Sequence, residues 1–441
     1  MQFPYAEVEI RSTGEIHDDA QQRAALELVA SSGATDVLVL CHGWNNDIPQ
    51  ARRLYQRLTD NLAAVRPAVP GEASRTLAVV GALWPSIRWS DEDEVAGGGV
   101  AVGDEAAALV GAIATRVEDP ARAALLTRLV PRLTDSAEAR QRFLDALREQ
   151  IPAAPAAPST GATEVDEDPP PTALLHADAE TVFQAVGGPE VDFGSPERSG
   201  GAASDLPGGM AGGMADATAG GAAGFGFDFD SVLAKARGVL NLTTYYTMKD
   251  RAGKVGSGGI ATLLSDLAGA STSGVRLHLA GHSFGARALA AAAVRQPRLH
   301  SYTLMQGAFS HHAFALDFDG RGGNGHFRPL LADRRLTGPM VVTHTVNDRA
   351  VGLAYAAASR LARQAGAGLG DADDPYGGIG RNGALKTPEV VQPGSELLEV
   401  GGGYQFQPGR VFNLKADRFI SSHGDVSGRQ VAYALYCAIN S

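Results

Sequence analysis

Short apolar runs alternate along the chain with longer segments in which apolar residues recur every three or four positions. The runs at 36–41, 76–83 and 275–280 are dominated by apolar residues, which is typical of strands buried on both faces of a parallel sheet. Segments 18–30 and 49–64 have the spacing of amphipathic helices. This alternation predicts an α/β fold with a mostly parallel sheet flanked by helices on both faces.

One segment interrupts this alternation. From residue 151 to about 216 the sequence is dominated by Pro, Ala, Gly and acidic residues, which bury too little apolar area to offset the backbone entropy lost on ordering. We therefore divide the chain into a first half of the core at 1–94, a helical insertion at 95–150, a flexible low-complexity insertion at 151–228 and a second half of the core at 229–441. Further expected elements are strands at 5–10, 302–306, 340–346 and 411–415, and helices at 286–294, 354–364 and 428–439.

Composition excludes several classes of protein. The chain has 441 residues, 44% of them hydrophobic, so it can bury a full core without disulfides, and we expect Cys41 and Cys437 to be free thiols. Its 38 Lys and Arg against 49 Asp and Glu, with no basic block, argue against nucleic acid as the principal partner. No signal segment and no run of about 20 uncharged apolar residues occurs, so we expect a cytoplasmic protein without a transmembrane segment.

The sequence Gly281-His-Ser-Phe-Gly285 lies between a predicted strand and a predicted helix. The pattern GxSxG alone is weak evidence in a chain with 54 glycines, but this position between strand and helix makes it more specific. A serine on a tight strand-to-helix turn needs small neighbours two residues before and after it, and both are glycines here. Ser283 is therefore a candidate nucleophile, and the amide of Phe284 can face a developing oxyanion.

A serine hydroxyl needs a base, and position decides among the 11 histidines. His423 lies in a loop between the last predicted strand and helix, at the same sheet edge as Ser283, whereas His278 and His282 are expected to have structural roles. Asp348 follows another strand and is the candidate acid that orients His423. Four other carboxylates remain rivals for that role: Asp317, Asp319, Asp417 and Asp425.

Further residues are expected around this centre. The strand at 36–41 leads into His42-Gly43-Trp44, where a glycine allows close approach and the amide of Trp44 can supply a second oxyanion donor. Gly43, Trp84 and His311 follow strand ends and are candidate substrate-binding residues. We expect no metal, because the acidic segment 317–324 has a cation where a calcium loop needs an oxygen ligand. Lys249, Arg251 and Lys254 are interpreted as a solvated helix end, with steering of an anionic substrate as the alternative.

These motifs as a set resemble the α/β-hydrolase superfamily, and within it a group of uncharacterised bacterial α/β-hydrolases. The resemblance covers the chain from about Val37 to its end, except for the insertion, and rests on His42-Gly-Trp-Asn-Asn46, Trp84-Pro-Ser86, Met248-Lys-Asp-Arg-Ala-Gly253, Gly281-His-Ser-Phe-Gly285, Asn347-Asp-Arg-Ala-Val-Gly352 and Ser422-His423. It implies an α/β-hydrolase fold with Ser283, Asp348 and His423 as the catalytic triad and the amides of Trp44 and Phe284 as the oxyanion hole.

The expected activity is that of a serine hydrolase that cleaves a carboxylic ester through an acyl-enzyme, without a cofactor. The expected partner is a small-molecule or lipid ester substrate. The same residues would serve an amidase, a peptidase or a phospholipase, and a binding or signalling module on a hydrolase scaffold is the alternative of a different class. The sequence gives no indication of the oligomeric state.

Overall fold

A computed structural model of the chain describes residues 2–44, 46–69, 75–86, 105–152, 164–165, 169–186, 229–270, 274–351, 358, 361, 376–392 and 394–441. Most of the predicted helix at 354–364 lies outside these residues. No helix in the described ranges is both long enough and apolar enough to cross a bilayer. The cytoplasmic location stays a prediction.

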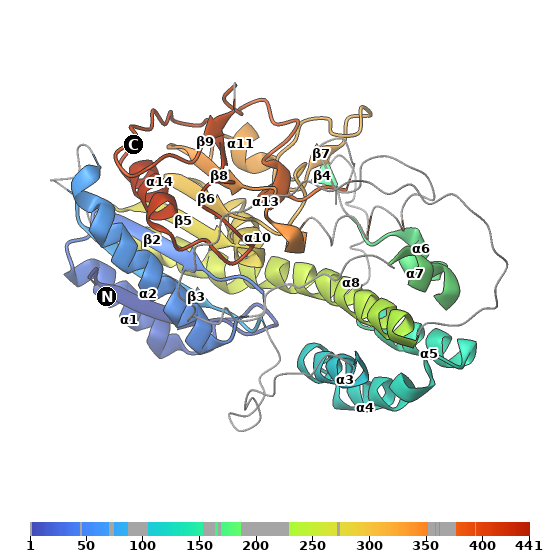
Figure 1. Cartoon of the computed structure of the whole chain (residues 1–441). Coiled ribbons are helices and arrows are strands. Elements are labelled where there is room, and N and C mark those ends of the chain that lie inside the picture. Colours follow the sequence, from blue (N-terminus) through green and yellow to red (C-terminus); the bar gives the residue numbers. More distant parts are fainter. Residues whose placement is uncertain are drawn as a thin grey trace, which may run out of the picture.

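An eight-stranded sheet forms the centre of the molecule (Figure 1). Its strand order is β1-β3-β2-β5-β6-β8-β10-β9, and each neighbouring pair is parallel. The sheet and its helices confirm the predicted α/β class. The strands are β1 (Tyr5–Glu9), β2 (Asp36–Cys41), β3 (Leu77–Leu83), β5 (Arg276–His282), β6 (Ser301–Met305), β8 (Met340–His344), β9 (Ser395–Glu396) and β10 (Val411–Lys415). A separate two-stranded sheet pairs β4 (Glu164–Val165) with β7 (Asn324–Gly325).

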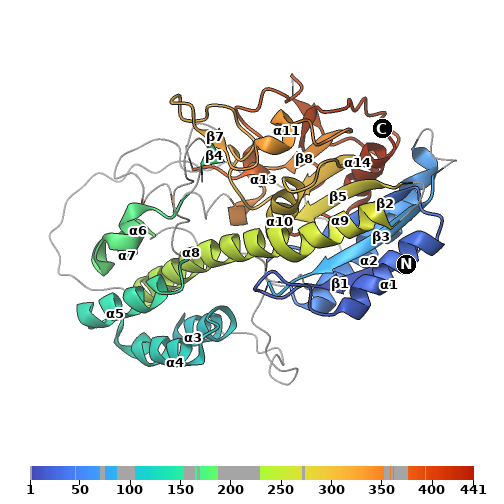
Figure 2. The ribbon, with the colours of Figure 1, turned by 180° about the vertical axis from the view of Figure 1, so that it is seen from behind.

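Two apolar layers, one on each face of the sheet, explain why Val37 to Cys41 of β2 are apolar without a break. Alternate residues of β2 point to opposite faces: Val37 and Val39 belong to one buried cluster, and Leu38 and Leu40 to the other. The helices α2 (Ile48–Val65) and α14 (Arg429–Ile439) cover the second cluster (Figure 1). The helices α1 (Asp19–Ser31), α9 (Ala261–Gly269) and α10 (Phe284–Ala293) cover the first (Figure 2).

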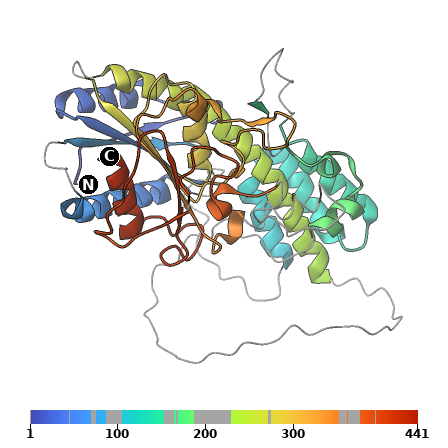
Figure 3. The same cartoon turned by 90° about the horizontal axis from the view of Figure 1, so that it is seen from above.

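A group of helices lies to one side of the sheet (Figure 3). The long helix α8 (Phe229–Val255) reaches from α10 to these helices, and a π-helical turn (Gly256–Ile260) connects it to α9. The group comprises α3 (Glu105–Arg116), α4 (Pro120–Leu129), a 3₁₀ turn (Val130–Arg132), α5 (Ala137–Arg148), α6 (Thr172–His176) and α7 (Ala179–Ala185). Shorter helical turns lie elsewhere in the described ranges, among them Arg66–Ala68, α11 (Pro329–Ala332) and α13 (Ile379–Asn382).

Helices α6 and α7 correct the prediction that the whole of 151–228 is flexible. Leu174, Val182 and Phe183 are buried in the larger apolar cluster, which also contains residues of α5 and α8. Their burial stabilises two short helices inside a segment whose average composition is unfavourable for ordering. The rest of that segment, apart from β4 and the residues around the two helices, lies outside the described residues.

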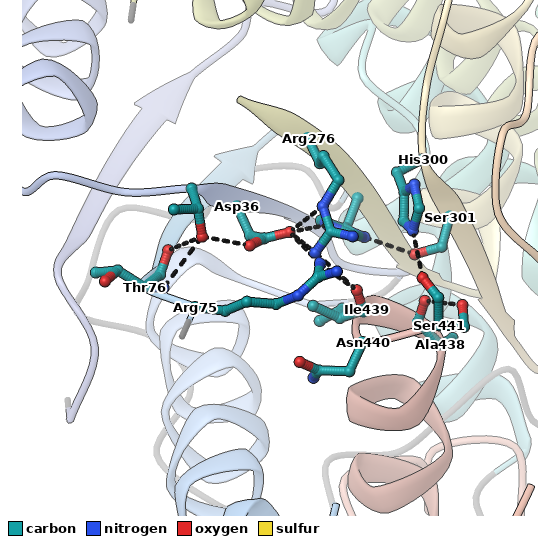
Figure 4. A network of polar contacts seen from close by, with 12 residues as sticks. Asp36, Arg75, Thr76, Arg276, His300, Ser301, Ala438, Ile439, Asn440 and Ser441 are labelled. Carbon is teal, nitrogen blue, oxygen red and sulfur yellow. Dashed lines mark hydrogen bonds and ion pairs between the residues drawn. The ribbon is translucent and has the colours of Figure 1, made fainter. Parts of the chain in front are cut away.

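A polar network ties the amino ends of β2, β5 and β6 together (Figure 4). Asp36, the first residue of β2, accepts hydrogen bonds from Arg276 Nε at 2.8 Å and Arg75 Nη1 at 3.3 Å. His278 Nε2 donates to the same carboxylate at 2.8 Å, while its Nδ1 accepts from Ser301 Oγ at 2.7 Å. Burial favours the neutral acid, but the bonds from His278 and Thr35 outweigh it and lower the pKa of Asp36.

Candidate active site

The order in which strands are added to the sheet changes direction at β2, between β3 on one side and β5 on the other. From β2 the next strand, β3, is added on one side, and the chain then returns to add β5 on the other side of β2. At such a point the loops after two adjacent parallel strands diverge and leave room for a ligand beyond the carboxyl ends of the strands. The segments that follow β2 and β5 contain Gly43 and Ser283, which the sequence predicted to lie together.

Ser283 occupies the sharp turn between β5 and α10. Its backbone has φ 55° and ψ −125°, a conformation that residues with a side chain rarely adopt. The flanking glycines allow this turn: a Cβ on Gly281 would lie 2.5 Å from Ala286 Cα, and one on Gly285 would overlap the carbonyl oxygens of Cys41 and His42. The GxSxG spacing therefore lets β5, α10 and the end of β2 meet closely around the serine.

Ser283, His423 and Asp348 are joined in a chain of hydrogen bonds. Ser283 Oγ lies 2.9 Å from His423 Nε2, and His423 Nδ1 lies 2.9 Å from Asp348 Oδ2. The Asp348 side chain is fully buried, and 12% of the His423 side chain is exposed. The other oxygen of Asp348 accepts the amide of Val351 at 3.0 Å, so the carboxylate is held from both sides. The sequence predicted these three residues, and the structure brings them together.

The rival carboxylates have other partners. Asp417 accepts hydrogen bonds from Thr345 Oγ1 at 2.8 Å and from the Val346 amide at 3.1 Å, which shape the loop that carries Asp348. Asp425 accepts from the amide and the hydroxyl of Ser421, within the loop of His423. Asp317 and Asp319 accept backbone amides of their own loop, at Gly322 and at Arg321 and Gly323. The bonds of Asp317, Asp319 and Asp425 stay within one loop, and those of Asp417 join the segment after β10 to the loop after β8. None of these bonds orients the imidazole of His423.

The turn after β2 packs directly against Ser283. A Cβ on Gly43 would lie 2.6 Å from Ser283 Cβ, so only glycine allows this approach. The next residue is Trp44, whose ring lies 6.2 Å from that of Phe284. Phe284 is the first residue of α10, where amide groups have no partner within the helix. Both expected oxyanion donors thus lie in backbone segments adjacent to Ser283.

Helix α2 begins soon after this turn, and its first residues hold the end of the turn at Asp47. The side chain of Asp47 accepts the Gln50 amide at 2.6 Å, and Gln50 Oε1 accepts the Asp47 amide at 2.8 Å, which is a capping box. Within α2, Tyr55 Oη accepts the His42 amide at 2.9 Å and donates to the Ala82 carbonyl at 2.6 Å. The sequence analysis missed Tyr55, because only the packed structure reveals which residue of α2 faces the end of β2.

Trp84 supports the same turn from the next strand. Its amide donates to His42 Nε2 at 3.2 Å, its indole N–H donates to the His42 carbonyl at 2.9 Å, and the two rings stack. Burial lowers the pKa of His42 to about 4, so its imidazole stays neutral and can accept that amide. These contacts give Trp84 a supporting position behind the turn, and its predicted role in binding substrate stays a prediction.

His311 is buried beneath the segment that contains α13. Its amide donates to the Gly377 carbonyl at 2.8 Å, and its Nδ1 accepts from Asn382 Nδ2 at 3.0 Å. Its ring also packs against His312, with ring centroids 4.0 Å apart. These bonds hold the loop of His311 to the segment around α13. They do not test the predicted contact of His311 with substrate, which stays a prediction.

The structure corrects the interpretation of the basic residues of α8 as a solvated helix end. Lys249 and Arg251 are buried rather than solvated. Arg251 forms an ion pair with Glu118 and donates to the Pro85 carbonyl at 3.0 Å, which ties α8 to the residues after β3 and α3. Lys254 alone matches the expectation of an exposed helix end, with Asp250 as its ion-pair partner at 2.7 Å.

A second Ser–His–Asp chain lies at the opposite edge of the sheet and provides a contrast. Ser301, His278 and Asp36 are linked by hydrogen bonds, but each is at most 1% exposed. A substrate has no access to such a chain, so the residue types alone do not make a catalytic site. Within the described ranges, no group of three or more His, Cys, Asp and Glu side chains could hold a metal ion.

Comparison with known proteins finds no relative of this chain. No family model, curated protein or solved structure matches the chain. The case for a function therefore depends on the residues and their geometry.

Proposed function

We propose that the chain is a serine hydrolase with an α/β-hydrolase fold that cleaves carboxylic esters. The observation that carries the proposal is the pair of 2.9 Å contacts that link Ser283 Oγ to His423 Nε2 and His423 Nδ1 to Asp348 Oδ2. The chain order Ser, Asp, His and the strand–serine–helix turn support this fold assignment.

In the proposed reaction, Ser283 Oγ attacks the ester carbonyl carbon while His423 Nε2 takes its proton. The amides of Trp44 and Phe284 stabilise the negative charge on the tetrahedral oxygen. The C–O bond then breaks, and His423 returns the proton to the leaving alcohol. Water, deprotonated by His423, releases the acid from Ser283, and Asp348 keeps Nδ1 protonated and stabilises the imidazolium in both steps.

Esters are favoured over amides and phospholipids only as the less demanding substrate class, because the same triad serves all three. A binding module that kept the scaffold is the alternative of a different class. The intact hydrogen-bonded triad argues against that alternative, because a binding role needs no serine aligned with a base.

The experiment compares wild type, Ser283→Ala and Ser31→Ala on p-nitrophenyl esters, phospholipids and peptides. Ser31 lies at the end of α1, where its hydroxyl contacts the Leu28 carbonyl, and it serves as a matched surface control. We expect ester turnover to fall by a factor of about 10⁴ or more in Ser283→Ala, and to persist in Ser31→Ala. Ester turnover retained by Ser283→Ala would overturn the proposal, and faster cleavage of peptides or phospholipids would reassign the substrate class.

A further inference from the structure

We propose that His282 is a positioning residue whose imidazole holds the backbone of His423 and the turn at Gly43 around the nucleophile. Its catalytic consequence rests on the proposed function, but its structural content does not. The sequence assigned this residue only a general structural role inside the GxSxG turn. Its neighbours in the structure assign it a more specific one.

The first observation is a hydrogen bond to the residue that carries the base. His282 Nε2 lies 2.9 Å from the His423 carbonyl oxygen, and since that oxygen can only accept, Nε2 is the protonated nitrogen. The two rings lie 4.9 Å apart, and His282 is only 5% exposed. This bond joins the residue before Ser283 to the backbone of His423, although the two are far apart in the sequence.

The second observation concerns the other side of the same ring. A Cβ on Gly43 would lie 2.9 Å from His282 Nδ1 and 3.2 Å from Cε1. His282 Nδ1 is buried and has no hydrogen-bond partner among the described residues, so packing alone fixes this side of the ring. The imidazole therefore fills the space between the turn at Gly43 and the loop of His423.

A neutral side chain is needed at this position. Burial, together with the neighbouring His423, lowers the pKa of His282 to about 3, so the ring carries no charge near neutral pH. In the proposed reaction His423 becomes an imidazolium, and a cation 4.9 Å away would oppose that step. A neutral donor holds the backbone without this penalty.

The test compares His282→Gln, which keeps an N–H donor of similar reach, with His282→Leu and His282→Phe, which fill space without a donor. His17→Leu, a change at an exposed histidine, is the control. We expect kcat for a p-nitrophenyl ester to fall about 10²-fold in the Leu and Phe variants with KM changed little, and to recover in the Gln variant. Equal kcat in the Gln, Leu and Phe variants would overturn the inference.

A second readout does not depend on activity. Amide hydrogen exchange over 419–427, measured on the full chain, should be faster in the Leu and Phe variants than in wild type and the Gln variant. If wild type hydrolyses no ester, the proposed function fails, and the exchange rates still decide whether His282 holds this loop. Equal exchange in all folded variants would show that it does not. Two variants without a donor are used, so that the failure of one to fold leaves the other to decide.

Discussion

At the scale of single residues, two carboxylates near the end of β8 have separate tasks. Asp348 accepts a hydrogen bond from His423, whereas Asp417 accepts from Thr345 and Val346 and so shapes the loop that carries Asp348. Asn347 links this loop to the loop of His423, because its Nδ2 donates to the Ile420 carbonyl at 2.9 Å. Asp348 and His423 are thus held relative to each other by a hydrogen bond between their loops as well as by their own bond.

Replacement of Asp348 by Asn should lower kcat by a factor of about 10⁴, because an amide N–H facing His423 favours the wrong tautomer of the imidazole. The matched change is Asp425→Asn, at a carboxylate that accepts hydrogen bonds from Ser421 within the loop of His423. Its loss of kcat should be far smaller. Ester hydrolysis measured for both variants checks this, and equal losses would contradict the assignment of Asp348 as the acid.

The sequence was informative about the proposed triad because each member lies in a turn or loop that comes after a predicted strand. Parallel strands end at one edge, so Ser283, Asp348 and His423 could be predicted to meet without knowledge of their contacts. The supporting residues Tyr55 and Asn347 could not be predicted in this way. Each acts through two hydrogen bonds to segments far away in the sequence, and only the packed structure shows which groups meet there.

At the scale of elements, the close contact between α10 and the end of β2 determines where Ser283 lies. Helix α10 begins immediately after Ser283, and a side chain on Gly285 would overlap the backbone oxygens at the end of β2. The carbonyl oxygens cannot move without breaking the turn that leads to Gly43. The helix must therefore shift if this glycine is replaced.

Gly285→Ala should lower the free energy of unfolding by about 1–3 kcal/mol, the usual cost of overpacking, and should also reduce turnover by displacing Ser283. Gly111→Ala is the control, since a Cβ there meets nothing within 4 Å in the exposed part of α3. That change should be neutral or should stabilise by about 0.4–1 kcal/mol. Urea unfolding measures both. If Gly285→Ala is as stable as Gly111→Ala, the proposed packing is wrong.

Elements that depend on tertiary contacts were the ones that sequence patterns predicted poorly. The bounds of β2 and β10 match the predictions: β2 is defined by the apolar run Val37–Cys41, and β10 by the buried residues Val411, Phe412 and Leu414. The strand predicted at 340–346 ends instead at His344, since Thr345 begins the loop shaped by Asp417. Helices α6 and α7 were missed, because their few apolar residues become significant only when they are buried against α5 and α8.

At the scale of the whole molecule, buried neutral histidines make stability depend on pH. Burial lowers the pKa of His42 and His278 to about 4 and, together with the neighbouring His423, that of His282 to about 3. In the unfolded chain these groups would titrate near the ordinary value of about 6.5. Below that pH the unfolded state therefore binds more protons than the folded state, and acid favours unfolding.

We expect the free energy of unfolding to fall as the pH is lowered from about 6.5 towards 4, by up to about 1.4 kcal/mol per pH unit for each histidine. The lowered pKa of Asp36 adds a further loss at still lower pH, when its carboxylate is protonated. Urea unfolding at a series of pH values between 7.5 and 4.5 tests this. A free energy of unfolding that stays constant over this range would contradict the burial of these histidines as neutral groups.

The central claim is that His423 and Asp348 activate Ser283, and labelling with a fluorophosphonate probe tests it most directly. The activated hydroxyl should attack phosphorus and expel fluoride, and peptide mass spectrometry should then find the added group on Ser283 of the wild-type protein. The folded His423→Ala variant should label far more slowly. Folded wild-type protein that stays unlabelled, or that carries the label on another serine, would contradict the account.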